Sequence, residues 1–135
     1  MSGIARWMAL PAGDRKLLVQ AVRLNLQARL LLRLWSVDRL RAWASRRAEG
    51  QMTADRVIWA GRAAARRMPF ATCLSSALAL QSLLARNGHA CELHIGVARE
   101  AGAFLAHAWI EFEGRVVLGE DEHRDYVRLL AWGRD

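Results

Sequence analysis

Apolar residues in the first half of the chain recur every three or four positions, the spacing of a helix with one buried face. In the first such row they are Leu17, Leu18, Ala21, Leu24, Ala28, Leu31 and Leu32. Ser36 and Thr53 are residue types that cap helices, and each precedes a further row of this kind. The pattern therefore predicts helices over residues 14–35, 37–47 and 53–67.

A fourth helix is predicted after the proline-containing break at residues 68–70. The third helix ends there because proline disfavours helical geometry in the residue before it. Leucines then recur over residues 74–84, and the Asn-Gly pair at residues 87–88 is typical of a helix C-terminus. We therefore expect Cys73 to lie at the N-terminus of a buried helix.

Beyond residue 88 apolar and polar residues alternate, which is typical of strands. The alternation predicts strands over residues 90–98, 104–112 and 115–118. A polar turn at residues 99–102 separates the first two strands. The Glu113-Gly114 connection makes the last two an antiparallel hairpin. Residues 125–132 are interpreted as a closing helix or a docked segment.

The length of 135 residues, with 53% apolar and 24% charged residues, indicates one compact domain over residues 1–135. Its helical part covers residues 14–67, and a further helix and the sheet cover residues 70–121. The predicted fold class is α+β: N-terminal helices, then a helix that starts with a cysteine and packs on a small antiparallel sheet.

The chain is strongly basic, with 20 Lys+Arg against 13 Asp+Glu, a net charge of +7 and a pI of about 11.1. This charge favours anionic partners such as an acidic peptide or an acidic protein surface. A solvated helix face explains the arginines equally well. Nucleic acid is not expected, because no reading motif or aromatic platform accompanies the arginines. Membrane contact is not expected either, because the amphipathic residues 17–34 are needed to cover the sheet.

Two cysteines, Cys73 and Cys91, are too few for a disulfide scaffold, and no Cys/His spacing indicates zinc. We expect no cofactor and no metal. The longest apolar stretch, residues 30–35, is far shorter than the roughly 20 residues that span a bilayer. No secretory signal is recognised at the start of the chain, so the expected location is the cytoplasm.

A cysteine, a histidine and an acid follow one another in an order that fits nucleophilic catalysis. A thiol attacks as the thiolate, which the unpaired N–H groups at a helix N-terminus favour, so Cys73 is suitably placed. His107, in the middle of the second predicted strand and on the face opposite its aliphatic row, is a candidate base. Glu120 and Asp121 follow the third strand, where an acid can orient the imidazole. Each residue alone is more often structural.

Other polar residues have simpler interpretations. Cys91 falls in the apolar row of its strand and is read as a buried small hydrophobe. His89 and His94 are interpreted as solvated or structural. Trp109 either packs or shields a catalytic ion pair from water. His123, among adjacent acids, is too generic a signal for a metal site.

Two blocks resemble the transglutaminase-like, papain-related fold, and most closely the leader peptidases of lasso-peptide biosynthesis. The first is the Cys-Leu-x-x-Ala-Leu-Ala-Leu helix at residues 73–80, and the second is the Ala-His-Ala-Trp-Ile-Glu strand at residues 106–111. The resemblance extends over residues 15–130, including the arginine- and leucine-rich helices ahead of the cysteine.

The resemblance implies that the protein removes the leader from a ribosomally made precursor peptide. Cys73 would attack the scissile carbonyl, and His107 would transfer the proton to the departing amine. In the family an Asp usually follows the His strand; here Glu120 is the preferred third member, with Asp121 next to it. The oxyanion would bind to the Cys73 N–H and a second, unassigned donor.

The same resemblance implies two protein partners. In this family a small leader-recognition domain acts with the peptidase, and we expect it here as a separate protein. A separate ATP-dependent lasso cyclase would then use the freed amine.

Two other functions remain open at this point. Acyl transfer to an amine uses the same three residues and differs from hydrolysis in the acceptor. A basic, non-enzymatic binding module would make the triad accidental, and its cysteine would be inert to thiol alkylators.

Overall fold

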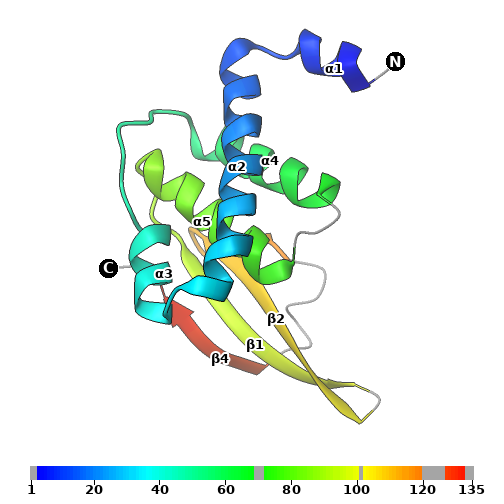
Figure 1. The fold of residues 1–135 in the computed structure, drawn as a ribbon, viewed down its shortest axis with the longest axis vertical. Helices are drawn as coiled ribbons and strands as arrows, with labels where there is room; N and C mark the ends of the chain where they lie inside the picture. Colours follow the sequence, from blue (N-terminus) through cyan, green and yellow to red (C-terminus); the bar gives the residue numbers. More distant parts are fainter. Residues whose placement is uncertain (1–2, 69–71, 101, 120–126, 133–135) are drawn as a thin grey trace.

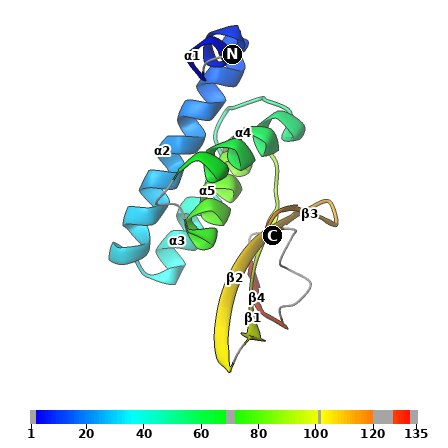
Figure 2. The ribbon, with the colours of Figure 1, turned by 90° about the vertical axis from the view of Figure 1, so that its right-hand side faces the viewer.

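The computed structural model describes residues 3–68, 72–100, 102–119 and 127–132. Within them the chain forms five helices and a four-stranded sheet, which lie in two layers (Figures 1 and 2). The helices are α1 (Gly3–Ala9), α2 (Ala12–Leu34), α3 (Val37–Ala44), α4 (Ala54–Arg67) and α5 (Cys73–Arg86). The strands are β1 (Glu92–Glu100), β2 (Ala103–Phe112), β3 (Arg115–Leu118) and β4 (Val127–Trp132). The predicted α+β fold class is confirmed.

Helices α3, α4 and α5 each begin directly after a residue whose side chain caps them. The Ser36 side chain accepts a hydrogen bond from the Arg39 N–H, and Thr53 does the same for Arg56. Thr72 and Ser75 form a reciprocal capping box at the start of α5. Each cap satisfies an N–H group that has no partner within its helix, and so fixes where that helix starts.

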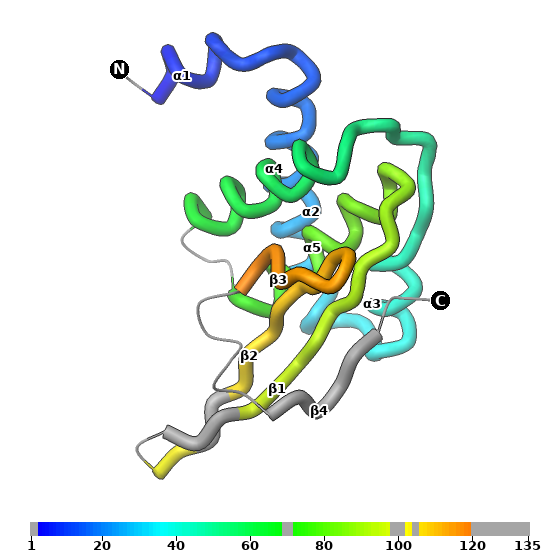
Figure 3. The backbone as a smooth tube through the Cα atoms, turned by 180° about the vertical axis from the view of Figure 1, so that it is seen from behind, coloured from blue at the N-terminus to red at the C-terminus, as the bar shows by residue number. Residues whose placement is uncertain are grey.

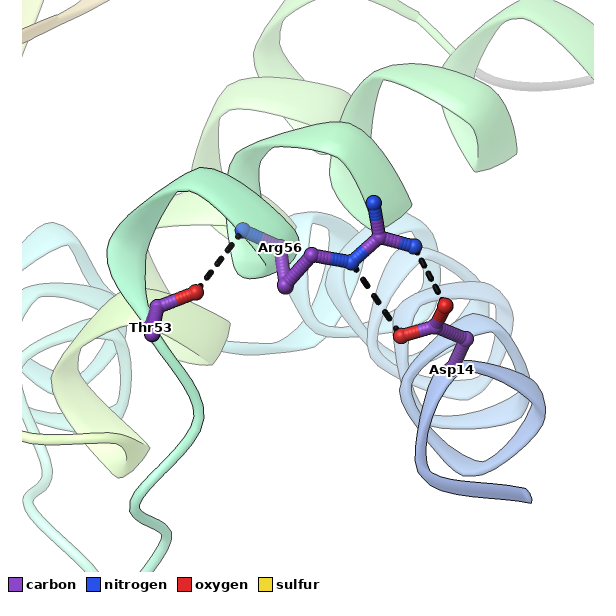
Figure 4. Close-up of polar contacts among 3 residues, drawn as sticks. All are labelled: Asp14, Thr53 and Arg56. Carbon is purple, nitrogen blue, oxygen red and sulfur yellow. Dashed lines mark hydrogen bonds and ion pairs between the residues drawn. The ribbon is translucent and has the colours of Figure 1, made fainter. Parts of the chain in front are cut away.

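An ion pair joins the start of α2 to α4 (Figure 4). The Arg56 side chain donates to both carboxylate oxygens of Asp14, with Nε 3.2 Å from Oδ1 and Nη2 bonded to Oδ2. Asp14 is buried. Because two parallel hydrogen bonds fix the planes of both groups, the pair sets how the two helices meet.

Helix α5 is the buried centre of the fold. Its residues from Ser75 to Ala85 are all buried, and it packs against α2 and α4 on one side and against β2 on the other. Helix α4 approaches closely at Gly61, where an added Cβ would lie 2.6 Å from Cδ1 of Leu80. A side chain at this position would force Leu80 to shift, so glycine allows the two helices to pack this closely.

Three buried polar residues anchor the start of α5 to α2. The Ser75 hydroxyl donates to Oδ1 of Asn25 at 3.1 Å, and Nδ2 of Asn25 donates to the Ser76 hydroxyl at 3.3 Å. All three residues are buried. Since buried polar groups lose free energy when they are unpaired, the bonds hold the first turn of α5 in one position on α2.

The sheet is antiparallel in the order β3-β2-β1-β4. Seen from behind, β1, β2 and β3 lie in front of α5 (Figure 3). The register pairs Leu93 with Ile110, and both belong to the core beneath α5. Because side chains alternate along a strand, the pair His94–Trp109 lies on the opposite face.

Two predictions about the ends of the chain are corrected. Residues 3–9 form α1, which the sequence pattern does not reveal because this helix has no buried residues. The helix predicted as one alternative for residues 125–132 is wrong for residues 127–132, which pair with β1 as β4. The sheet therefore extends beyond the predicted limit of residue 121, because pairing with a distant strand overrides local pattern.

The polar turn predicted at residues 99–102 is shorter in the structure, because β1 extends to Glu100 and β2 starts at Ala103. Among the described residues, no helix combines the length and apolar character needed to cross a membrane.

Replacing Asn25 tests the anchor at the start of α5. We expect Asn25→Ala to lower the free energy of unfolding by about 1–3 kcal/mol, because it removes a buried hydrogen bond from each of Ser75 and Ser76. Urea unfolding measures the change. Gln27→Ala, on the exposed side of the same helix, is the matched control and should stay within about 0.5 kcal/mol of wild type. Equal losses in both variants would contradict the assigned role.

Candidate active site

Cys73 is the first residue of α5 and is exposed. The capping box uses the Ser75 N–H, and the Thr72 carbonyl accepts from the Ser76 N–H. The N–H groups of Cys73 and Leu74 therefore have no acceptor within the helix. Unpaired N–H groups at a helix start stabilise negative charge, so this end of α5 suits a thiolate or an oxyanion.

His107 lies in β2 and is buried, with 8% of its surface exposed. Its cross-strand partner is Gly96, which carries no side chain beside the ring. Nε2 of His107 lies 3.4 Å from the Gly119 carbonyl oxygen, just beyond the end of β3. A carbonyl only accepts hydrogen bonds, so this contact favours the tautomer that carries its proton on Nε2.

Gly119 permits this contact. Its φ angle is 82°, and an added Cβ would lie 3.0 Å from both Nε2 of His107 and Cβ of Trp109. A larger residue would strain the backbone and displace the imidazole. The sequence analysis missed this residue; its only signal was a glycine directly after a strand.

Trp109 stacks between two histidines on the face of the sheet away from α5. Its ring centroid lies 6.2 Å from that of His107 and 5.5 Å from that of His94. The Trp109 indole N–H donates to Oε2 of Glu111 at 3.0 Å, and the same oxygen lies 3.4 Å from Nε2 of His94. His94 is buried, so it is structural rather than solvated. The Trp109 ring thus lies against one face of the His107 ring and restricts its rotation.

The structure brings the elements of the candidate pair together. Helix α5 packs on β2, and its contacts with the sheet are with β2 and β1 (Figure 1). The core row of β2, Ala108 and Ile110, faces α5, whereas His107 lies on the other face. Strand β3 pairs with residues 110–112 of β2, so beside His107 that edge of β2 has no strand partner among the described residues.

Cys73 thus starts the helix that packs on one face of β2, and His107 lies on the other face of the same strand. No hydrogen bond joins these two described residues. Glu120 and Asp121, the candidates for the third member, lie outside the described residues, as does His123.

The second cysteine differs from the first in its surroundings. Cys91 is buried, as predicted, but it lies directly before β1 and not within the strand, which starts at Glu92. Burial, and to a lesser extent the charge of Glu92, raises the pKa of Cys91 to about 12. At neutral pH this thiol is protonated and is no nucleophile.

His89 is structural. Its Nε2 donates to the Met52 carbonyl oxygen at 2.8 Å, which ties the turn after α5 to the segment before α4. Among the described residues, no three His, Cys, Asp or Glu side chains come together as metal ligands do.

Alkylation of the native protein tests the contrast between the two thiols. We expect iodoacetamide at pH 7.5 to modify Cys73 at least about a hundredfold faster than Cys91, because Cys91 is buried and its raised pKa keeps it protonated. Mass spectrometry of the digested protein identifies the labelled cysteine. Cys73→Ser should remove the fast phase, and unfolding in urea should expose both thiols. Fast labelling of Cys91 in the folded protein would contradict this assignment.

Comparison with known proteins identifies the family. The chain matches the family model of the Transglutaminase-like superfamily over residues 17–131. Searches of curated proteins and of solved structures gave no significant match. Members of this superfamily are generally enzymes with a Cys-His-Asp/Asn site, and their activities are of the cysteine-peptidase or transferase type. A cysteine at the start of a buried helix that packs on a histidine-bearing strand fits this pattern, and the chain belongs to the transglutaminase-like superfamily.

Proposed function

We propose that this protein is a cysteine peptidase that removes the leader from a ribosomally made lasso precursor peptide before cyclisation. The observation that carries the proposal is the exposed Cys73 at the start of a buried helix packed on the strand of His107. Superfamily membership supports the reaction type. The finer assignment to leader removal rests on the resemblance of residues 73–80 and 106–111 to the lasso leader peptidases.

In the proposed mechanism, the Cys73 thiolate attacks the scissile carbonyl. Nδ1 of His107 first accepts the thiol proton and then delivers it to the departing amine, which leaves with the core peptide. The leader stays bound to sulfur as a thioester. Water, activated by the same nitrogen, then attacks the thioester and releases the leader as a carboxylic acid.

Three further groups would support this chemistry. The Cys73 N–H, which has no acceptor within α5, would donate to the oxyanion. Glu120 would stabilise the imidazolium, with Asp121 as the neighbouring alternative. Trp109 already lies against one side of the imidazole and would limit its contact with water.

The proposed partners follow from the same resemblance. A separate leader-recognition protein would present the precursor, and a separate ATP-dependent cyclase would join the freed amine to an acidic side chain. The mechanism requires no cofactor or metal from this chain. The proposed location is the cytoplasm, where both thiols stay reduced.

The runner-up is acyl transfer, in which an amine replaces water in the second step. The exposure of Cys73 favours hydrolysis, because water reaches the thioester. Formation of the leader acid, rather than a leader amide with an added amine, separates the two reactions by mass.

Cleavage of a lasso precursor peptide, in the presence of its recognition protein, tests the proposal. We expect Cys73→Ala and His107→Ala to lower the rate by about three orders of magnitude or more, because each removes a reacting group. Mass spectrometry measures the leader and core products over time. Cys91→Ala is the matched control for loss of a thiol and should cleave as wild type does. Unchanged cleavage by Cys73→Ala would exclude the cysteine mechanism.

Single substitutions of the two acids identify the third member. We expect Glu120→Ala to leave slow turnover, lowered by about tenfold to a thousandfold, because the acid stabilises a charge but forms no bond with substrate. The same cleavage assay measures kcat. Asp121→Ala is the matched control and should retain most of its activity. Full activity in Glu120→Ala beside an inactive Asp121→Ala would move the role to Asp121.

A further inference from the structure

An apolar groove of about 650 Å³ lies between α1, α2 and α4, away from the sheet. Its apolar lining includes Trp7, Leu18, Val22 and Trp59. Among pockets that hold small molecules or peptide side chains, this volume is ordinary. It has room for two or three large side chains of a ligand.

The charges around the groove are of one sign. The exposed residues Arg6, Arg66 and Arg67 line it together with the apolar residues. No Asp or Glu occurs among the lining residues. The one acid of α2, Asp14, is buried and paired with Arg56. The groove therefore suits a ligand that combines apolar side chains with negative charge.

The shape favours a peptide over a membrane surface. A bilayer offers a flat face, whereas this groove is concave and lies between three helices. One wall is also fixed in place, because the Arg56 guanidinium lies 4.4 Å from the centre of the Trp59 ring. A preformed concave site binds separate side chains at a lower entropic cost than a mobile one.

The groove is also within reach of the nucleophile. Arg67 ends α4, and six chain steps separate it from Cys73. Six residues span at most roughly 22 Å. A bound peptide that leaves the groove near Arg67 can thus reach Cys73 with about six or seven extended residues.

We propose that this groove is an exosite for an acidic, apolar segment of the leader, on the side of the scissile bond that becomes the acyl-enzyme. The inference rests on the proposed peptidase function and adds a binding site for the leader on this chain itself. The apolar side chains of the segment fill the groove, and its carboxylates face Arg6, Arg66 and Arg67. Binding there holds the leader while Cys73 attacks.

A binding experiment with the full-length Cys73→Ala chain tests the exosite without turnover. The probe is a fluorescein-labelled synthetic 16-residue peptide, with Leu at helical spacing and Glu at most other positions, and fluorescence anisotropy gives the Kd. We expect the probe to bind at least about tenfold more tightly than the same peptide with Lys in place of Glu. A Lys peptide that binds equally well would overturn the proposal.

Two matched variants locate the binding. Val22→Asp places a charge in the groove and should weaken binding about tenfold. Leu34→Asp makes the same change on the exposed side of α2 outside the groove and should stay within about twofold. Should Val22→Asp unfold, the double variant Arg66→Ala/Arg67→Ala replaces it, with Arg33→Ala as its control. Equal effects of the groove variant and its control would overturn the proposal.

Other occupants give different results. Sedimentation of the protein with phosphatidylglycerol vesicles, without peptide binding, would assign the groove to a lipid surface. A dimer that Val22→Asp dissociates would assign it to a second copy of this chain. Either result overturns the exosite.

The exosite and the peptidase activity fail separately. If the peptide binds in a way that depends on Val22 but the protein cleaves no precursor, the peptidase proposal is wrong and the groove is still a peptide-binding site. Cleavage that is lost in Cys73→Ala but has the same KM in Val22→Asp would remove the exosite alone. With both correct, Val22→Asp raises KM about tenfold and leaves kcat unchanged.

Discussion

Burial of α5 on every side is the constraint on which the rest of the structure depends. Its residues from Ser75 to Ala85 are buried between helices α2 and α4 on one side and the sheet on the other. A helix packed at this density cannot slide or tilt without opening cavities in several contacts at once. Its first residue, Cys73, is nevertheless exposed. The fold thus presents one reactive group to solvent at the end of its most constrained element.

Hydrogen bonds and an ion pair add directional constraints to the apolar packing of the helices. Apolar contacts are non-directional, so hydrogen bonds add to the constraint that packing places on the rotation and register of α5. At its first turn Asn25 accepts from the Ser75 hydroxyl and donates to the Ser76 hydroxyl. The Asp14–Arg56 ion pair plays a similar part where α2 meets α4. Both contacts have one partner on α2, so this helix is joined to α4 and to α5 by specific polar contacts.

The sequence predicted those features that local patterns determine. The four longer helices follow from apolar spacing and from caps such as Thr53, and the β2–β3 hairpin follows from alternation around Gly114. Helix α1 and strand β4 were missed because one buries nothing and the other depends on pairing with β1. In the candidate site, the sequence predicted the element positions of Cys73, first in α5, and of His107, within β2. Gly119 was missed because its role is a close approach in space, which no spacing encodes.

The contact between His107 and Gly119 also bears on what the proposed acid contributes. The Gly119 carbonyl oxygen lies 3.4 Å from Nε2, a contact that favours the tautomer in which Nδ1 would be the proposed base. Stacking on Trp109 restricts rotation of the ring. Orientation is therefore supplied by backbone and packing before any carboxylate takes part. The carboxylate of Glu120 or Asp121 would then act mainly on the imidazolium, by stabilising its charge after the thiol proton has moved. Loss of the acid removes that stabilisation and leaves a correctly oriented base, which is why the proposed triad tolerates this loss better than loss of sulfur or imidazole.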